Sequence, residues 1–261
     1  MEKKAVLAVS FGTSYKEVIE SCIVPVEKAI AGALCGWDFY RAFTSGMITK
    51  KLSEKEHIFI DRPPEALKKL YEAGYRDIIV QPTHILAGAE YHALKAQTED
   101  FAREHGDVRL RLGQPVLFEN EDYARVADAL QTYMPKTGED EMVLLMGHGS
   151  EHFSNAAYFV LQHYLDQLPA QAVCIANVEA PPLLETVMKT MKEKHIKKVY
   201  VMPFMLVAGD HAKNDMAGDD EDSWKMQLLR AGFEPEIILK GLGESPDFVE
   251  IYREKAAKNL L

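Results

Sequence analysis

Short apolar runs alternate with amphipathic stretches along this chain. KAVLAVSF at 4–11 is an almost continuous apolar run of strand length. PPEALKKLYEAGY at 63–75 repeats its apolar residues with a helical period and begins with proline, which suits the first turn of a helix. The pattern predicts strands at 4–11, 37–45 and 76–86, and helices at 15–32, 47–52 and 63–75. Alternation of this kind indicates an α/β fold with a parallel sheet.

The second half of the chain repeats the pattern of the first half. KAVLAVSFGTS at 4–14 resembles EMVLLMGHGSE at 141–151. RDIIVQPTHILAGAEYHA at 76–93 resembles KKVYVMPFMLVAGDHAKN at 197–214, and a similar helix precedes each of these two segments. We therefore expect two related α/β lobes.

The predicted boundary between the lobes lies in TYMPKTGEDE at 132–141, where proline, glycine and charge interrupt the apolar pattern. The last segment, SPDFVEIYREKAAKNLL, has a serine-proline start and a helical pattern, and we expect it to pack back on the first lobe. The predicted domains are an N-terminal lobe at 1–135, a C-terminal lobe at 136–245 and a C-terminal helix at 246–261.

The composition of the chain argues against several classes of function. The net charge of -10 argues against a nucleic-acid binder, which normally has a basic surface. No stretch approaches the roughly 18 apolar residues of a membrane span. The first residues resemble a buried strand more than a signal peptide, so we expect a cytoplasmic protein.

The chain has no G-x-x-x-x-G-K-[ST] loop, and we expect no nucleotide cofactor. The oligomeric state is not readable, and a homo-oligomer is compatible with the sequence.

The three cysteines, Cys22, Cys35 and Cys174, are far apart and form no C-x-x-C pair. This arrangement is typical of free thiols in a reducing compartment.

Three potential metal ligands recur at nearly even intervals. His148, Glu179 and His211 are separated by 31 and 32 residues, and each follows an apolar run. A strand, a crossover helix and two loops need about 30 residues or more, so the three can follow successive parallel strands. Loops that follow the strands of an open parallel sheet lie on one edge, where ligands bind. Two imidazoles and a carboxylate at this edge predict a site for a divalent metal ion. His152 is either an auxiliary ligand or a residue at a helix start.

The first half has a different set of residues at the equivalent positions. Under the repeat, Phe11 corresponds to His148, Glu90 to His211 and, approximately, Thr44 to Glu179. The other candidates in this half are Ser10, Thr13, Ser14, Arg41, Ser45 and His84. We expect one lobe to bind the metal and the other to bind the rest of a substrate, with a cleft between them.

Three of these candidates also have ordinary structural interpretations. Arg41 can bind a substrate carboxylate through two hydrogen bonds or form an ion pair within the protein. His84 is either a cleft residue or a buried imidazole with partners of its own. Glu90 either faces the cleft or favours the start of a helix through the helix dipole.

Several segments together resemble one known family. They are SFGTS, FYRAFTSGMI, PTHILAGAEY, MGHGSEH and the long, unusual stretch PFMLVAGDHAKNDMAGDDEDSWK. Across nearly the whole chain, the sequence resembles the sirohydrochlorin cobaltochelatases of the CbiK type, the anaerobic cobalt chelatases of cobalamin biosynthesis. The resemblance implies two Rossmann-like lobes and a tetrapyrrole cleft. It also implies a metal site at His148, Glu179 and His211, the residues that the spacing selects.

The resemblance implies that Co²⁺ is inserted into sirohydrochlorin, with the metal as a substrate. His148 and His211 would hold the ion, and Glu179 would ligate it or accept a proton. The residues alone also allow a ferrochelatase or nickel chelatase of the same fold, or a protein that binds metal or tetrapyrrole without turnover.

Overall fold

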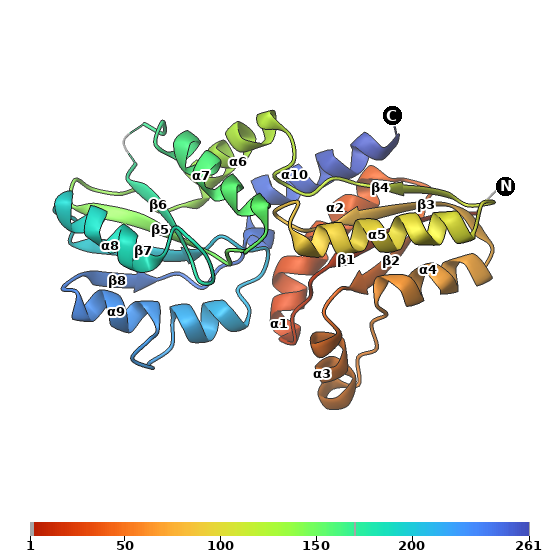
Figure 1. Cartoon of the computed structure of the whole chain (residues 1–261), viewed down its shortest axis with the longest axis horizontal. Helices are drawn as coiled ribbons and strands as arrows, with labels where there is room; N and C mark the ends of the chain where they lie inside the picture. The colour runs from red at the N-terminus through yellow and green to blue at the C-terminus, as the bar shows by residue number, and fades with distance from the viewer. Residues whose placement is uncertain (1–2, 170, 261) are drawn as a thin grey trace. The chain divides into compact units, whose positions relative to one another are not determined.

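The computed structural model describes residues 3–169 and 171–260, and the chain divides into two compact units (Figure 1). The first unit comprises the described residues up to Phe118 and from Phe248 onwards, and the second is Glu119–Asp247. The boundary predicted at 135 therefore lies inside the second unit. The helix α6, Asn120–Tyr133, belongs to that unit because it packs on α7, where the ring of Tyr123 stacks on Tyr164. The break in TYMPKTGEDE is the loop after this helix.

The first unit contains a four-stranded parallel sheet in the order β2-β1-β3-β4. Its strands are β1 Lys3–Ser10, β2 Asp38–Phe43, β3 Tyr75–Pro82 and β4 Arg109–Leu112. Its helices are α1 Lys16–Val18, η1 Ile19–Ile23, α2 Val24–Ala33, α3 Gly46–Glu56, α4 Pro63–Glu72 and α5 Ala89–Glu104. Leu7 and Val9 of β1 pack with Leu67 of α4 and Leu94 of α5, so these two helices cover the same face of the sheet.

The C-terminal helix α10, Pro246–Ala257, packs on the first unit, and the short turn η5, Lys258–Leu260, follows it. Its buried Tyr252 donates a hydrogen bond of 2.9 Å to the carbonyl oxygen of Thr83, directly after β3. The side-chain amide of Asn259 donates to Gln81 Oε1 at 2.9 Å. Both contacts attach the end of the chain to the central part of the first sheet.

The second unit repeats this topology, with parallel strands in the order β6-β5-β7-β8. Its strands are β5 Glu141–Gly147, β6 Val173–Asn177, β7 Lys198–Pro203 and β8 Glu234–Ile237. Its other helices are η2 Phe153–Asn155, α7 Ala156–Leu165, α8 Leu184–Glu193, η3 Ala212–Met216, α9 Trp224–Arg230 and η4 Leu242–Glu244. Leu144 of β5 packs with Met191 of α8, Met216 of η3 and Leu228 of α9. The predicted α/β fold with an internal repeat is thus confirmed.

The predicted elements agree with the structure in position and differ in detail. The helix expected at 15–32 is interrupted by the π-helical turn η1, and α3 continues to Glu56 instead of ending at residue 52. The edge strands β4 and β8 were not predicted. Their sequences, RLRL and EPEI, are short, partly exposed and not continuously apolar.

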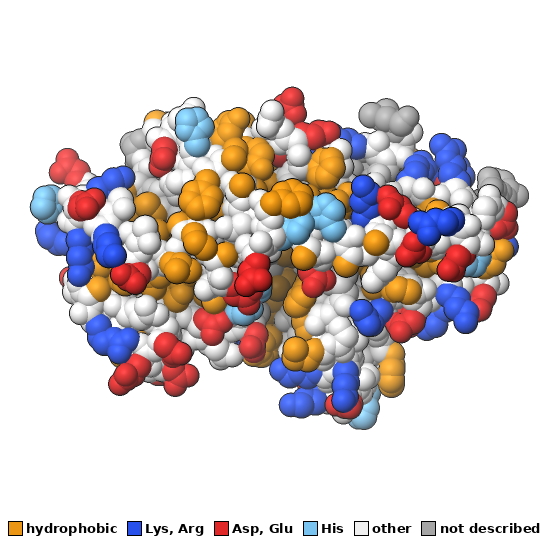
Figure 2. All heavy atoms as spheres, viewed as in Figure 1, with side chains coloured by type: hydrophobic (Ala, Val, Ile, Leu, Met, Phe, Trp, Pro, Cys, Tyr) orange, Lys and Arg blue, Asp and Glu red, His pale blue; other side chains and the backbone are white. Residues whose placement is uncertain are grey.

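Side chains of different kinds gather on the surfaces of the two units (Figure 2). Lysine side chains gather over α3, and apolar side chains gather over α7, where Phe159 and Val160 are exposed. Among the helices of residues 3–169 and 171–260, none combines the length and apolar character that a membrane crossing requires.

Candidate metal site

The second unit brings His148, Glu179 and His211 together. His148 follows β5, Glu179 follows β6 and His211 lies between β7 and η3. Since β5 is the central neighbour of both β6 and β7, and all three strands are parallel, their carboxyl ends meet at one edge of the sheet. One potential ligand atom from each residue lies within 4.8 Å of the others. The residues that the spacing selected therefore form a compact group of two imidazoles and a carboxylate.

The two imidazole rings are oriented by hydrogen bonds through Nδ1. His148 Nδ1 lies 2.9 Å from the carbonyl oxygen of Gly149, and His211 Nδ1 lies 2.5 Å from Asp215 Oδ2. The rings stand perpendicular, with their centroids 4.8 Å apart. Glu179 Oε2 is 3.5 Å from His148 Nδ1. The three side chains are between 38% and 53% exposed, so an incoming ion can reach them without unfolding the loops.

Backbone hydrogen bonds join the loops that carry His148 and Glu179. The N–H of Glu179 donates to the carbonyl oxygen of His148 at 2.9 Å, and that of Val178 donates to Gly147 at 3.1 Å. Asn155 adds a side-chain bridge between the same loops. Its Oδ1 accepts from the N–H of Ser150 at 3.0 Å, and its Nδ2 donates to the carbonyl oxygen of Pro181 at 2.6 Å. Asn155 was not predicted from the sequence, because nothing in its spacing distinguishes it from other polar residues.

Glycine is required at position 149 by the backbone and by its surroundings. Gly149 has φ +81°, in the left-handed region that other residues rarely adopt. A Cβ at this position would lie 2.7 Å from the backbone nitrogen of Ala180 and 2.9 Å from Asn177 Cβ. The close approach brings the loop after β5 against the loop that carries Glu179.

His152 lies outside the group of ligands. Its Nδ1 accepts from the N–H of Ser154 at 3.2 Å and lies 3.0 Å from Ser154 Oγ, and its ring packs against Phe153. It is the N-cap of η2, which is the helix-start interpretation that the sequence left open.

In the first unit, the loops after β1, β2 and β3 converge in a similar way. The N–H groups of Thr44 and Ser45 donate to the carbonyl oxygens of Ser10 and Phe11, at 2.9 and 3.3 Å. Thr83 Oγ1 donates to Ser10 Oγ at 2.8 Å. The edge of this sheet therefore gathers four of the residues predicted to bind substrate.

Several of these residues have local structural roles. Ser45 caps α3 by accepting from the N–H of Ile48, and Thr13 Oγ1 accepts from the N–H of Tyr15. Phe11 is 48% exposed, which is unusual for a large apolar side chain. Glu90 lies exposed in the first turn of α5, which agrees with the helix-start interpretation.

Arg41 does not reach this edge as a free cation. Its guanidinium forms two hydrogen bonds with the buried carboxylate of Glu27 on α2, one of them from Nε to Oε1 at 2.7 Å. The hydrogen bond to Glu27 raises the pKa of Arg41. The structure therefore favours the ion pair over the predicted role in binding a substrate carboxylate. The cause is tertiary packing, since Glu27 faces β2 from α2.

His84 has an unusual environment directly after β3. Both ring nitrogens are buried and have no hydrogen-bond partner among the described residues, although the residue as a whole is half-buried. Burial lowers the pKa of His84 to about 4, so the imidazole is neutral near pH 7. The hydroxyl of Thr44 is likewise buried and unpartnered within the described part of the chain. Among the described residues, the structure therefore does not support the interpretation of His84 as a buried imidazole with hydrogen-bond partners of its own.

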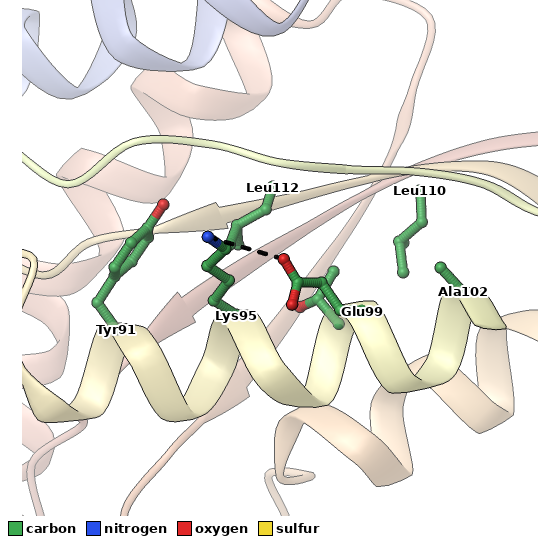
Figure 3. Close-up of a pocket in the computed structure, with 7 residues that line it drawn as sticks. Tyr91, Lys95, Glu99, Ala102, Leu110 and Leu112 are labelled. Atoms are coloured by element: carbon green, nitrogen blue, oxygen red, sulfur yellow. Dashed lines mark ion pairs between the residues drawn. The ribbon is translucent and has the colours of Figure 1, made fainter. Parts of the chain in front are cut away.

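A separate hollow lies between α5 and β4 of the first unit (Figure 3). Tyr91, Lys95 and Glu99 line it from the helix, and Leu110 and Leu112 line it from the strand. Lys95 and Glu99 form an ion pair of 3.7 Å of the kind common one turn apart on exposed helices. None of the residues selected from the sequence lies there, and we do not regard it as the functional site.

The chain is similar to known proteins over nearly its whole length. A family model described as cobalt chelatase (CbiK) matches residues 4–260. A sirohydrochlorin cobaltochelatase of Salmonella typhimurium is 42% identical over 246 residues, covering 94% of this chain and 91% of the relative. The sirohydrochlorin cobaltochelatase CbiKC of Nitratidesulfovibrio vulgaris is 31% identical over 253 residues, covering 97% and 89%.

Solved structures share the fold at lower sequence identity. SirB from Bacillus subtilis with Fe³⁺ has a TM-score of 0.68 at 18% identity, covering 99% of this chain and 97% of that one. CbiX, described as the terminal enzyme of siroheme biosynthesis in denitrifying bacteria, has a TM-score of 0.57 at 16% identity, covering 99% and 100%. These two show the architecture alone. Since the family model spans nearly the whole chain and two relatives exceed 30% identity over most of their length, the chain belongs to the cobalt chelatase (CbiK) family.

Proposed function

We propose that this protein is a sirohydrochlorin cobaltochelatase that inserts Co²⁺ into sirohydrochlorin in the anaerobic, early-cobalt route of cobalamin biosynthesis. The observation that carries the proposal is the convergence of His148, Glu179 and His211 at one sheet edge in a chain of the CbiK family. The two relatives described above bear the name of this activity.

The donor set suits an ion that must be bound and then released. Imidazole nitrogens bind Co²⁺ well, and a carboxylate adds charge, whereas thiolates favour softer ions and hold them more tightly. No cysteine belongs to this group of potential ligands in the described part of the chain. His148, Glu179 and His211 would therefore hold Co²⁺ as a substrate, with open positions for the incoming tetrapyrrole.

Metallation also requires proton acceptors, because the tetrapyrrole loses two pyrrole N–H protons as its four nitrogens bind the metal ion. Glu179 is half-exposed beside His148, within reach of the bound ion. We assign it to ligation or to acceptance of one of these protons, and a neutral histidine can accept the other.

The first unit supplies the residues for the tetrapyrrole. We assign this role to Ser10, Phe11, Thr13, Thr44, Ser45 and His84. The exposed ring of Phe11 offers an apolar surface to a macrocycle. The buried, unpartnered Thr44 hydroxyl and His84 nitrogens offer polar groups whose hydrogen-bonding capacity is unused within the described chain.

We also propose that the protein works in the cytoplasm. Cys22, Cys35 and Cys174 are all free, which suits a reducing compartment.

The proposal is tested by adding Co²⁺ and sirohydrochlorin to the purified protein and following the visible spectrum, with a protein-free reaction as the control. Many equivalents of product per protein, at a rate above the control, support a chelatase. Product that stops at one equivalent indicates a binding protein. Parallel reactions with Fe²⁺ and Ni²⁺ establish metal preference, and faster insertion of either ion than of Co²⁺ contradicts the proposed substrate.

A further inference from the structure

We propose that Asp215 is a positioning residue that fixes His211 in the orientation and tautomer needed for Co²⁺ binding. The inference deepens the proposed function and rests on it. Its basis is the hydrogen bond of 2.5 Å between His211 Nδ1 and Asp215 Oδ2. Asp215 was not among the residues predicted from the sequence, although it lies within the unusual segment AGDHAKND.

The backbone around this pair is held by the core of the second unit. His211 and Asp215 lie four residues apart at the π-helical turn η3, whose Ala212 and Met216 are completely buried. Met216 and Ala212 belong to the cluster that packs against β5 and α8. The two polar side chains therefore extend towards solvent from a turn whose apolar side chains anchor it.

The chemistry of the partner determines which nitrogen carries the proton. A neutral imidazole has one N–H donor and one acceptor nitrogen, and an ionised carboxylate can only accept. The proton of His211 therefore lies on Nδ1, and Nε2 presents its lone pair to the metal. Carboxylate partners of this kind orient metal-bound histidines and increase their basicity.

His148 reaches the same tautomer by a different route. Its Nδ1 donates to the carbonyl oxygen of Gly149 at 2.9 Å, since a carbonyl oxygen can only accept. Both rings thus offer Nε2. The carboxylate of Asp215 lies 2.5 Å from His211 Nδ1, whereas Glu179 Oε2 lies 3.5 Å from His148 Nδ1 and is itself one of the potential ligands. We infer that His211 is the stronger donor of the two, and that Asp215 is the reason.

A merely structural role for the pair makes different predictions. If the hydrogen bond only stabilised η3, removing it would lower stability and leave the tautomer of His211 and the binding of Co²⁺ unchanged in the folded protein. Asn keeps an acceptor oxygen for Nδ1 but removes the charge. Asp215→Asn therefore separates the orientation of the His211 ring from the effect of the carboxylate charge on its basicity. Asp220→Ala is the matched control, since Asp220 is an exposed acidic residue further along the same segment.

The experiment combines Co²⁺ calorimetry with ¹⁵N NMR of the histidine rings, at one pH throughout. For Asp215→Ala we expect a ten- to hundred-fold loss of Co²⁺ affinity and a mixture of tautomers at His211. Asp215→Asn should keep the Nδ1–H tautomer and show an intermediate loss, and Asp220→Ala should match the unmodified protein. In turnover, Asp215→Ala should raise KM for Co²⁺ more than KM for sirohydrochlorin.

His211→Ala makes failure of this inference distinguishable from failure of the proposed function. If His211→Ala binds Co²⁺ normally, the metal site itself is wrong. If His211→Ala loses Co²⁺ while Asp215→Ala retains both affinity and tautomer, the role of Asp215 alone is overturned. Should Asp215→Ala fail to fold, Asp215→Asn decides: affinity equal to that of the unmodified protein overturns the electrostatic role, and a lost Nδ1–H tautomer overturns the positioning role.

Discussion

The backbone N–H of Glu179 donates a hydrogen bond of 2.9 Å to the carbonyl oxygen of His148. This bond joins the loops after two adjacent strands at the positions of two potential ligands. The relative placement of the two residues therefore depends on main-chain geometry, and only side-chain rotation remains to be fixed. Donors held in this way lose little conformational freedom when a metal ion binds.

The first prediction concerns the two imidazoles. His148→Ala and His211→Ala should each weaken Co²⁺ binding by about ten-fold or more, because each removes a ligand, and loss of even a ligand's supporting partner costs about that much. Isothermal calorimetry measures the effect. The control is His163→Ala on α7, outside the group of ligands, which should bind Co²⁺ normally. Unchanged binding in both ligand variants would contradict the assignment.

A second prediction follows from the loop around Gly149. Gly149→Ala should lower stability by more than the roughly 1–2 kcal/mol expected for a left-handed residue, because the new Cβ would also meet the backbone of Ala180 at 2.7 Å. It should also weaken Co²⁺ binding by displacing the loops that carry His148 and Glu179. Urea unfolding and calorimetry measure the two effects.

Gly232 provides the matched control for that prediction. It has φ +90°, and a Cβ there would meet nothing within 4 Å. Gly232→Ala should therefore show the strain of the left-handed backbone alone, with normal Co²⁺ affinity. Equal effects of the two substitutions would show that the contact with Ala180 has no consequence.

The proximity of His148, Glu179 and His211 could be predicted from the sequence, because it depends on the order of strands and loops along the chain. Even spacing places His148, Glu179 and His211 after three parallel strands, and adjacent parallel strands bring their carboxyl ends together whatever the details of packing. Arg41 illustrates the opposite case. Its position in a strand was predictable, but its partner depends on which residue of α2 faces that strand, and Glu27 has no signature in the sequence.

In the fold, too, elements with a strong pattern in the local sequence were predictable and elements without one were not. Continuous apolar runs identified β1, β3, β5 and β7, which are covered on both faces, whereas the short edge strands β4 and β8 carry too few apolar residues to be recognised. The lack of a hydrogen-bond partner for the His84 ring among the described residues was also beyond prediction, because hydrogen bonding of buried groups is a property of the packed structure.

The third prediction tests the ion pair of Arg41 with Glu27. Arg41→Ala leaves the nearly buried Glu27 carboxylate without its cation, which typically costs 3–5 kcal/mol. Because the Arg41 side chain is 28% exposed, water can partly replace it, and we expect a loss of about 3 kcal/mol in urea unfolding. Binding of sirohydrochlorin, measured by fluorescence titration of the folded variant, should be unchanged.

Lys69→Ala is the control for this pair. Lys69 forms an exposed ion pair with Asp61, and surface pairs contribute about 0–1 kcal/mol. Its loss should hardly change stability. If Arg41→Ala instead retains full stability and loses affinity for sirohydrochlorin, Arg41 binds the substrate and the structural role of its ion pair is refuted.

The fourth prediction concerns pH and His84. Burial lowers the pKa of His84 to about 4 in the folded protein, against about 6.5 for an unperturbed imidazole. Between these values the unfolded chain binds the proton and the folded protein does not, so stability falls as pH decreases from about 6.5 towards 4 and levels off below. The full loss of unfolding free energy that His84 causes over this pH range is on the order of 3 kcal/mol.

The variant His84→Phe isolates this contribution, because it keeps an aromatic ring and removes the titrating group. Other histidines and the carboxylates titrate in both proteins and cancel in the comparison. Urea unfolding at pH 7 and pH 4.5 should show a larger loss of stability for the unmodified protein than for the variant. An equal loss would mean that the His84 imidazole gains a proton in the folded state, and therefore that water or a polar partner reaches its ring nitrogens. The proposed role of His84 as an unpaired hydrogen-bonding group for the tetrapyrrole would then lose its physical basis, since a ring already satisfied by water gains little from a ligand.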